Sequence, residues 1–273
     1  MLALLLHSYL LLLLLVEHKL LVERKGRVAV RNIKLIIEYD GTNYAGWQRQ
    51  SNIMTIQEKV ECAIEKITGE KTQITGSSRT DAGVHAKGYT GNFYTNSKIS
   101  VEKFTGAINS KLPLDIVILH CYEVDRDFHS RYNSTGKMYS YTILNRYEAV
   151  AVGRNYIYHH KAVLDIEAMK QASEYFIGTH DFSAFRNLGS SVKTSVRTIT
   201  RLDIIKNDDI IKVYIAADGF LYNMVRIIVG ALVRVGEGKI KPNEIKNIIL
   251  SKQRAKAGKS VPPGGLCLEE VFY

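Results

Sequence analysis

Residues 76–86 read GSSRTDAGVHA, a polar stretch dense in small side chains between two segments with the apolar pattern of strands. Small side chains let a backbone approach a ligand closely, and functional groups are often placed on such loops. Arg79 and Asp81 are two positions apart, so an extended backbone would direct both to the same side. A carboxylate beside a cation stays ionised and can act as a nucleophile or base. The alternative is a turn in which Asp81 caps backbone amides and Arg79 is solvated.

The sequence before this loop predicts a strand, a second loop and a helix. Apolar residues alternate over 33–39, which is the period of a half-buried strand. A polar, glycine-containing loop covers 40–53. Thr55 stands three residues before Glu58, the signature of a capping box, and apolar residues then recur at helical spacing until Gly69. This last segment is therefore predicted to be an amphipathic helix.

The rest of the first half continues the alternation of strands and helices. Strands are predicted on both sides of the GSSRTDAGVHA loop, then a helix and a further strand, in the segments 72–77, 88–95, 101–110 and 115–124. The resulting order is β-α-β-β-α-β, which is the order of ferredoxin-like folds.

The second half shows a similar order. Strands are predicted at 137–144, near 156–159, on both sides of the turn at 207–209 and at 266–272, and helices at 166–177, 220–235 and 242–251. The two halves predict an α+β protein with two sheet-containing subdomains, 31–132 and 133–273. No proline-rich or glycine-rich linker marks the boundary between them.

Residues 1–16 form a nearly pure apolar run. The run lacks the basic start and the small-residue cleavage site of a secretory signal, and it is shorter than the about 20 apolar residues of a membrane-spanning helix. We therefore expect no membrane anchor and place residues 1–30 outside the fold; the alternative is a membrane-tethered protein that uses residues 1–16. Because bacterial genes can start at a GUG codon, which translation displays as Val, we expect the natural chain to begin at or near Val30.

Composition narrows the class of partner. The chain carries 37 Lys and Arg against 27 Asp and Glu, a formal net charge of +10, which suits a polyanion. Cys62, Cys121 and Cys267 are odd in number and far apart, so neither a disulfide framework nor a zinc site is indicated, and a cytoplasmic location is expected. The histidines form no helical pair with metal-ligand spacing, so no metal is assigned.

The 76–86 loop resembles, residue for residue, the active-site loop of the TruA family of tRNA pseudouridine synthases, whose core reads RTDAGVHA. Other similar stretches follow in family order over 32–273: EYDG at 38–41, GWQRQ at 46–50, IQE at 56–58, LPLDI at 112–116, FHSR at 128–131, KMYSY at 137–141, GTHDF at 178–182, MVRIIVG at 224–230 and PPGGL at 262–266. Together, these matches in family order indicate the family far more specifically than any single stretch does.

The resemblance implies a fold and a function. The fold would be two ferredoxin-like or RNP-like antiparallel sheets, with helices on one side and the active-site cleft between them. The activity would be the conversion of uridine to pseudouridine in tRNA, at positions 38, 39 and 40 of the anticodon arm, by a homodimer that needs no metal or redox cofactor.

The resemblance also implies roles for four residues. Asp81 would be the catalytic carboxylate. Arg79 and Arg226 would hold that carboxylate ionised and help to fill the space that the extruded nucleotide leaves. Tyr139 would stack on the flipped uracil, and its hydroxyl could relay the C5 proton.

Without the resemblance, each of these residues has an ordinary alternative. Tyr139 would be a packing residue of an alternating strand. Arg226, in a helix otherwise rich in apolar residues, would extend its charge to solvent instead of meeting Asp81. For the whole chain, the alternative is a non-catalytic RNA-binding protein, for which basic charge and aromatic strands suffice.

Overall fold

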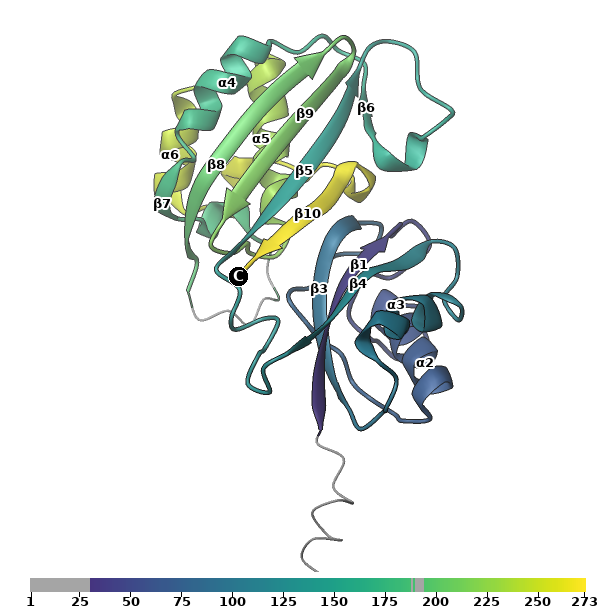
Figure 1. Cartoon of the computed structure of the whole chain (residues 1–273). Helices are drawn as coiled ribbons and strands as arrows, with labels where there is room; N and C mark the ends of the chain where they lie inside the picture. Colours follow the sequence, from purple (N-terminus) through teal and green to yellow (C-terminus); the bar gives the residue numbers. More distant parts are fainter. Residues whose placement is uncertain (1–29, 188, 190–193) are drawn as a thin grey trace, which may run out of the picture.

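The computed structural model describes residues 30–187, 189 and 194–273 (Figure 1). The first half contains, in order, β1 (Arg31–Tyr39), α2 (Ile56–Thr68), β2 (Thr75–Gly76), β3 (His85–Thr95), α3 (Val101–Asn109) and β4 (Ile116–Val124). This is the predicted β-α-β-β-α-β order. The predictions about residues 1–29, including a start near Val30, lie outside the described residues.

The second half contains more elements than the first. It contains β5 (Gly136–Asn145), β6 (Tyr158–His160), α4 (Ile166–Glu174), β7 (Gly178–Asp181), β8 (Val196–Asn207), β9 (Ile210–Ala217), α5 (Met224–Gly236), α6 (Glu244–Ser251) and β10 (Leu266–Phe272). No helix in the described ranges is long and apolar enough to cross a membrane.

The strands of both halves join in a single mixed sheet with the order β4-β1-β3-β10-β5-β9-β8-β7. The C-terminal strand β10 makes this junction, because it pairs antiparallel with β5 and parallel with β3. The predicted α+β class is therefore confirmed, and the two predicted antiparallel sheets are parts of one continuous sheet. The subdomain limits 31–132 and 133–273 remain predictions.

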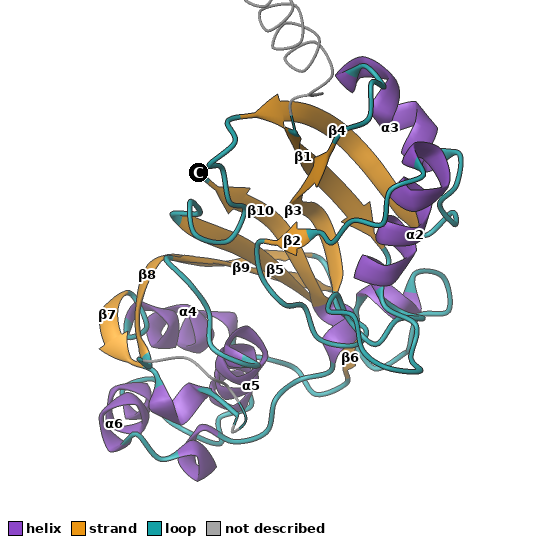
Figure 2. Ribbon diagram, turned by 90° about the horizontal axis from the view of Figure 1, so that it is seen from below, coloured by secondary structure: helices purple, strands orange, loops and turns teal. Residues whose placement is uncertain are grey.

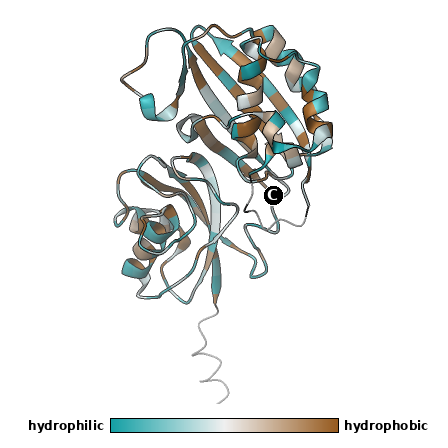
Figure 3. Ribbon diagram, turned by 180° about the vertical axis from the view of Figure 1, so that it is seen from behind, coloured by the Kyte–Doolittle hydropathy of each residue, from teal (hydrophilic) through white to brown (hydrophobic). Residues whose placement is uncertain are grey.

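The helices lie on one face of this sheet, as predicted. Helices α2 and α3 cover β1, β3 and β4, and α4, α5 and α6 cover the strands of the second half (Figures 1 and 2). Apolar residues run along the strands and along the helix faces that cover them (Figure 3). The largest fully buried side chains come from both halves, among them Trp47, Tyr89, Tyr141, Phe93 and Phe176.

The ends of α2 show how local sequence sets an element. The Thr55 hydroxyl accepts a hydrogen bond from the Glu58 amide, and Gly69 ends the helix in the left-handed conformation at φ 73°. Ile56, Val60 and Ile64 are fully buried, because their helical spacing places them on one face. The helix thus connects the 40–53 loop to the segment that leads to the 76–86 loop.

Several elements differ from the predictions: among them, β3 begins at His85 instead of 88, and α4 ends at Glu174 instead of 177. Helix α5 begins at Met224, not at Phe220, because Asn223 is in the left-handed conformation at φ 61°, which a continuous helix does not allow. The strand predicted over 72–77 is reduced to β2, Thr75–Gly76. Strand β7 was not predicted, because only four residues form it and their burial does not alternate.

Candidate active site

The loop between β2 and β3 is held by the polar loop that follows β1. The Trp47 amide donates to the Thr80 carbonyl at 3.2 Å, and the Gly83 amide donates to the Tyr44 carbonyl at 3.3 Å. The Thr80 hydroxyl also bonds the buried Tyr39 hydroxyl at 2.8 Å. Three contacts thus fix the backbone on both sides of Asp81.

Two glycines allow this close backbone contact. A Cβ atom at Gly41 would overlap the Val84 carbonyl, and one at Gly46 would overlap the Thr80 carbonyl. Gly46 also has φ 90°, which other residues rarely adopt. The EYDG and GWQRQ stretches, 38–41 and 46–50, therefore support the 76–86 loop.

Asp81 meets Arg226 across the two halves of the molecule. Its side chain is 26% exposed, and its Oδ2 lies 3.5 Å from Arg226 Nη1. The guanidinium is oriented by two further acceptors, because Nε donates to the Val261 carbonyl and Nη1 to Asn223 Oδ1, both at 2.8 Å. The pairing of Asp81 with Arg226 is as predicted.

Burial and charge act in opposite directions on Asp81. Burial raises the pKa of Asp81, and the charge and hydrogen bond of Arg226 lower it; the net shift is upward. The sequence led us to expect cations to dominate. Burial dominates instead, and the Arg226 guanidinium only makes the upward shift of the Asp81 pKa smaller. A raised pKa favours a carboxylate that can exchange a proton.

Arg79 does not pair with Asp81, and the predicted contact is wrong. Arg79 is exposed and makes no hydrogen bond or ion pair within the described residues. The loop is not extended here: Thr80 is buried and bonded to Tyr39, and the chain turns where the Val84 amide donates to the Asp81 carbonyl. A role for Arg79 in binding substrate remains a prediction.

Tyr139 lies on β5, near enough to Asp81 for the charge of that carboxylate to act on its hydroxyl. Its ring is 6% exposed and packs edge-on against Phe220, with the ring centroids 5.1 Å apart. Burial raises its pKa, the Ser78 side chain works in the opposite direction, and the charge of Asp81 raises it further. The hydroxyl therefore remains protonated at neutral pH and can donate a hydrogen bond.

Lys137 lies two residues before Tyr139 on the same strand face. It is buried, and burial lowers the pKa of this lysine to about 8. Tyr141, also on this face, donates its hydroxyl hydrogen to the Pro262 carbonyl at 2.7 Å. Tyr141 is thus a packing residue, whereas Lys137 is a buried cation that the sequence gave no reason to single out.

The sequence reasoning did not identify the groups that orient Arg226. One is the Asn223 side chain, and the other is the backbone carbonyl of Val261. Asn223 gave a usable signal, because Asn is one of the few residues that tolerate positive φ at a helix start. A carbonyl acceptor gives no signal in residue type, although Val261 directly precedes the PPGGL stretch at 262–266.

Comparison with known proteins shows which family the chain belongs to. A family model described as tRNA pseudouridine synthase matches residues 35–133 and 172–273. The chain is 61% identical over 244 residues to "tRNA pseudouridine synthase A 2" of Clostridium perfringens, a match that covers 89% of this chain and 100% of the relative. It is 59% and 56% identical over the same shares to proteins named tRNA pseudouridine synthase A from Clostridium botulinum (strain Eklund 17B) and Acetivibrio thermocellus. The chain therefore belongs to the TruA family of tRNA pseudouridine synthases, isomerases that convert uridine to pseudouridine in tRNA.

Proposed function

We propose that Asp81 is the catalytic carboxylate of this isomerase and that the uridine is bound between Asp81 and Tyr139. The observation that carries this proposal is the convergence on Asp81 of groups from both halves, with Arg226 at 3.5 Å. The carboxylate is partly exposed, so a ligand can reach it, while the backbone around it is fixed.

The reaction breaks the bond between ribose C1′ and uracil N1 and forms a bond between C1′ and C5. The uracil stays bound and turns between the two steps, C5 loses its hydrogen, and N1 gains a proton. Asp81 acts either by adding to the substrate or by removing a ribose proton, and both routes need the ionised carboxylate. Arg226 favours this form, because its charge lowers the pKa of Asp81.

Tyr139 and Arg79 complete the proposed site. The Tyr139 ring is held edge-on by Phe220 and offers a face on which a flipped uracil can stack. Its protonated hydroxyl can donate a hydrogen bond to the base or take part in the transfer of the C5 proton. Arg79 is exposed, and its proposed role is to help fill the space that the extruded nucleotide leaves.

The substrate uridines are those at positions 38, 39 and 40 of the anticodon arm, and recognition rests more on tRNA shape than on base sequence. Extruding a paired base costs a few kcal/mol, which the contacts to the flipped uridine must offset. Mapping of pseudouridine in tRNA from cells with and without the gene tests this assignment. Loss of pseudouridine elsewhere, with positions 38–40 unchanged, would contradict it.

The decisive experiment is the variant Asp81→Asn. The amide keeps the size of the carboxylate but cannot act as a nucleophile or base, so tritium release from tRNA labelled at uracil C5 should fall below detection. Affinity for tRNA should be unchanged or slightly tighter, because lysine and arginine contacts to phosphates supply most of it.

The matched control for this variant is Asp203→Asn, in the exposed ion pair with Arg201 on β8. It should bind tRNA and turn it over like the parent enzyme. Near-normal turnover by Asp81→Asn would reject the assignment and favour the alternative of a non-catalytic RNA-binding protein.

The enzyme is further proposed to be a cytoplasmic homodimer. Two-fold dimers are the commonest assembly, and a second subunit would extend the basic surface that supports a bulky L-shaped tRNA. Cys62, Cys121 and Cys267 are all free thiols, which suits a reducing compartment. Sedimentation equilibrium tests the dimer, and full activity at concentrations where only monomer is present would contradict it.

A further inference from the structure

The proposed catalytic groups are divided between the two halves of the molecule. Asp81 belongs to the first half, and Tyr139 and Arg226 belong to the second. The backbone pairing that joins the halves at β3 and β10 is short, because it includes only two pairs, Cys267 with His85 and Leu268 with Ala86. Side-chain contacts near this joint are therefore needed to fix Asp81 relative to its partners.

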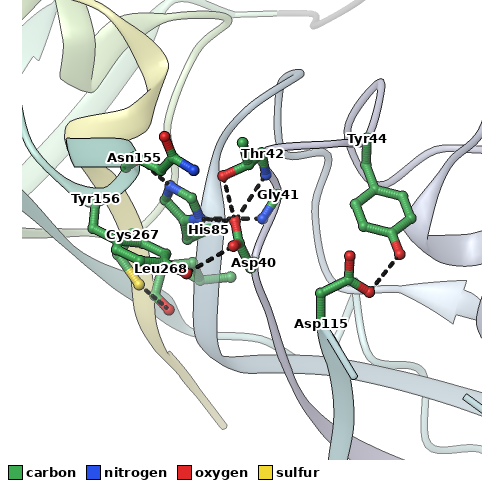
Figure 4. A network of polar contacts seen from close by, with 10 residues as sticks. All are labelled: Asp40, Gly41, Thr42, Tyr44, His85, Asp115, Asn155, Tyr156, Cys267 and Leu268. Carbon is green, nitrogen blue, oxygen red and sulfur yellow. Dashed lines mark hydrogen bonds and ion pairs between the residues drawn. The ribbon is translucent and has the colours of Figure 1, made fainter. Parts of the chain in front are cut away.

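A buried histidine stands at the catalytic end of this joint. His85, the histidine of the GSSRTDAGVHA stretch, is 5% exposed, and both of its ring nitrogens have partners. Nδ1 accepts a hydrogen bond from the Gly41 amide at 3.1 Å and lies 3.0 Å from Asp40 Oδ1. Nε2 lies 3.1 Å from the Asn155 carbonyl oxygen (Figure 4). His85 thus contacts both halves.

Asp40 makes a second connection between the halves. Its Oδ1 accepts from the amide and hydroxyl of Thr42, and its Oδ2 accepts from the Tyr156 hydroxyl at 2.7 Å (Figure 4). The Tyr156 ring also packs on the His85 ring, with the centroids 4.9 Å apart. Burial raises the pKa of Asp40, but bonds from Thr42 and Tyr156 and the charge of His85 outweigh it, so the carboxylate is ionised at neutral pH.

The connection to the second half does not depend on the charge of His85. When Nδ1 accepts from the Gly41 amide, the ring is neutral and its hydrogen lies on Nε2, which donates to Asn155. When Nδ1 is also protonated, it donates to Asp40 Oδ1 and Nε2 still donates to Asn155. One bond to the second half is present in both states.

The segment held in this way leads back to Asp81. A Cβ atom at Gly264 would lie 2.7 Å from the Asn155 carbonyl oxygen, so the two backbones are in close contact. Pro263 would lie 3.0 Å from a Cβ atom at Gly83, in the catalytic turn. Val261, in the same stretch, binds Arg226, which pairs with Asp81. The contacts therefore run from His85 through Asn155 to the 262–266 stretch and return to Gly83, so that they begin and end on the 76–86 loop.

We propose that His85, Asp40 and Tyr156 are positioning residues that clamp the Arg154–Tyr156 turn of the second half onto the catalytic loop and so fix Asp81 against Arg226 and Tyr139. This inference rests on the proposed role of Asp81. None of the three clamp residues needs to contact the uridine. Loss of the clamp therefore lowers kcat more than it raises KM for tRNA.

Two substitutions of His85 separate the clamp from local support of the loop. His85→Gln places an amide nitrogen near the position of Nε2 and can still donate to Asn155. His85→Asn places its amide near Nδ1 and loses the Asn155 contact. The clamp predicts a kcat within about threefold of the parent for His85→Gln and about a thirtyfold loss for His85→Asn, since a factor of ten corresponds to only 1.4 kcal/mol. If His85 only supported the 40–42 segment through Nδ1, His85→Asn would instead keep a higher kcat than His85→Gln.

Tyr156→Phe tests the second connection. It keeps the ring on His85 but removes the bond to Asp40, and kcat should fall about fivefold with KM changed less than twofold, as for the loss of one hydrogen bond of ordinary net strength on a half-exposed side chain. The matched control is Tyr147→Phe in the same β5–β6 connection, where the tyrosine is 74% exposed. This control should behave like the parent.

Trp47 provides a readout independent of turnover. It is the single tryptophan of the chain, and its amide bonds the Thr80 carbonyl beside Asp81. His85→Asn should change its emission at temperatures where the variant is folded, and His85→Gln should not. Parent-like kcat and emission in His85→Asn and Tyr156→Phe would overturn the clamp, whereas an active Asp81→Asn would overturn the proposed function itself.

Discussion

Within the described part of the chain, one cation acts on the carboxylate of Asp81. Burial raises the pKa of Asp81, and the charge and hydrogen bond of Arg226 lower it. Removing the guanidinium charge must therefore raise the pKa further. A carboxylate with a higher pKa becomes protonated at a higher pH when the solution is acidified.

The loss of the Arg226 charge should change how kcat depends on pH in the variant Arg226→Gln. Because the reaction proposed for Asp81 needs its ionised form, the acid limb of kcat against pH should move to higher pH in Arg226→Gln. Tritium release measured between pH 4.5 and 8 checks the shift. Arg234→Gln is the control, because Arg234 lies on the same helix and bonds the Lys256 carbonyl. An unchanged acid limb in Arg226→Gln would mean that Arg226 does not govern this ionisation.

Only some of the contacts around Asp81 could be predicted from the sequence. The Asp81–Arg226 pair was predictable, because an arginine in an apolar helix needs a carboxylate partner. The solvent-facing position of Arg79 was not, because spacing predicts direction only where the backbone is extended. The roles of Val261 and Asn155 were also not predictable, because both act through backbone carbonyls.

At the scale of elements, local signals predicted most of the secondary structure. Helix α2 was predicted well because its cap residues, Thr55 and Gly69, act within one turn of its ends. Errors occurred where tertiary contacts decide the outcome. Apolar residues continue through the start of α5, so periodicity alone extended the helix back to Phe220. The short β2 is defined by pairing with β3, which no local pattern encodes.

The loop that supports Asp81 can be tested through its glycines. Gly41→Ala should disturb the catalytic loop, because the new Cβ atom would overlap the Val84 carbonyl. We expect a destabilisation of about 2–4 kcal/mol and a lower kcat in the folded fraction, as for overpacking of a close-packed site. Urea unfolding and single-turnover tritium release measure the two effects.

The matched control is Gly106→Ala in α3. A Cβ atom at Gly106 meets nothing within 4 Å, so alanine should stabilise the protein by about 0.5–1 kcal/mol through its higher helix propensity. Equal effects of the two substitutions on stability would show that the contact between Gly41 and Val84 is not tight in solution.

At the scale of the whole molecule, the junction of the two halves was the least predictable feature. The order of elements in each half indicated two similar sheets, and both are present. The last strand, β10, was predicted at its observed residues, but its place between β3 and β5 was not. Pairing between strands far apart in sequence depends on the packing of the whole chain, and this pairing brings Asp81 to Tyr139 and Arg226.

The net charge of +10 predicts how the whole molecule responds to salt. Each phosphate neutralised by a lysine or arginine releases counterions, so contacts to about six phosphates would weaken tRNA affinity about a thousandfold between 50 and 200 mM salt. Filter binding with Asp81→Asn measures this slope without turnover. At saturating tRNA, kcat of the parent enzyme should change little, because the Asp81–Arg226 pair is partly buried and is screened less than surface charges. A kcat that falls with salt as steeply as the affinity would mean that the catalytic groups depend on the same exposed contacts that hold the tRNA.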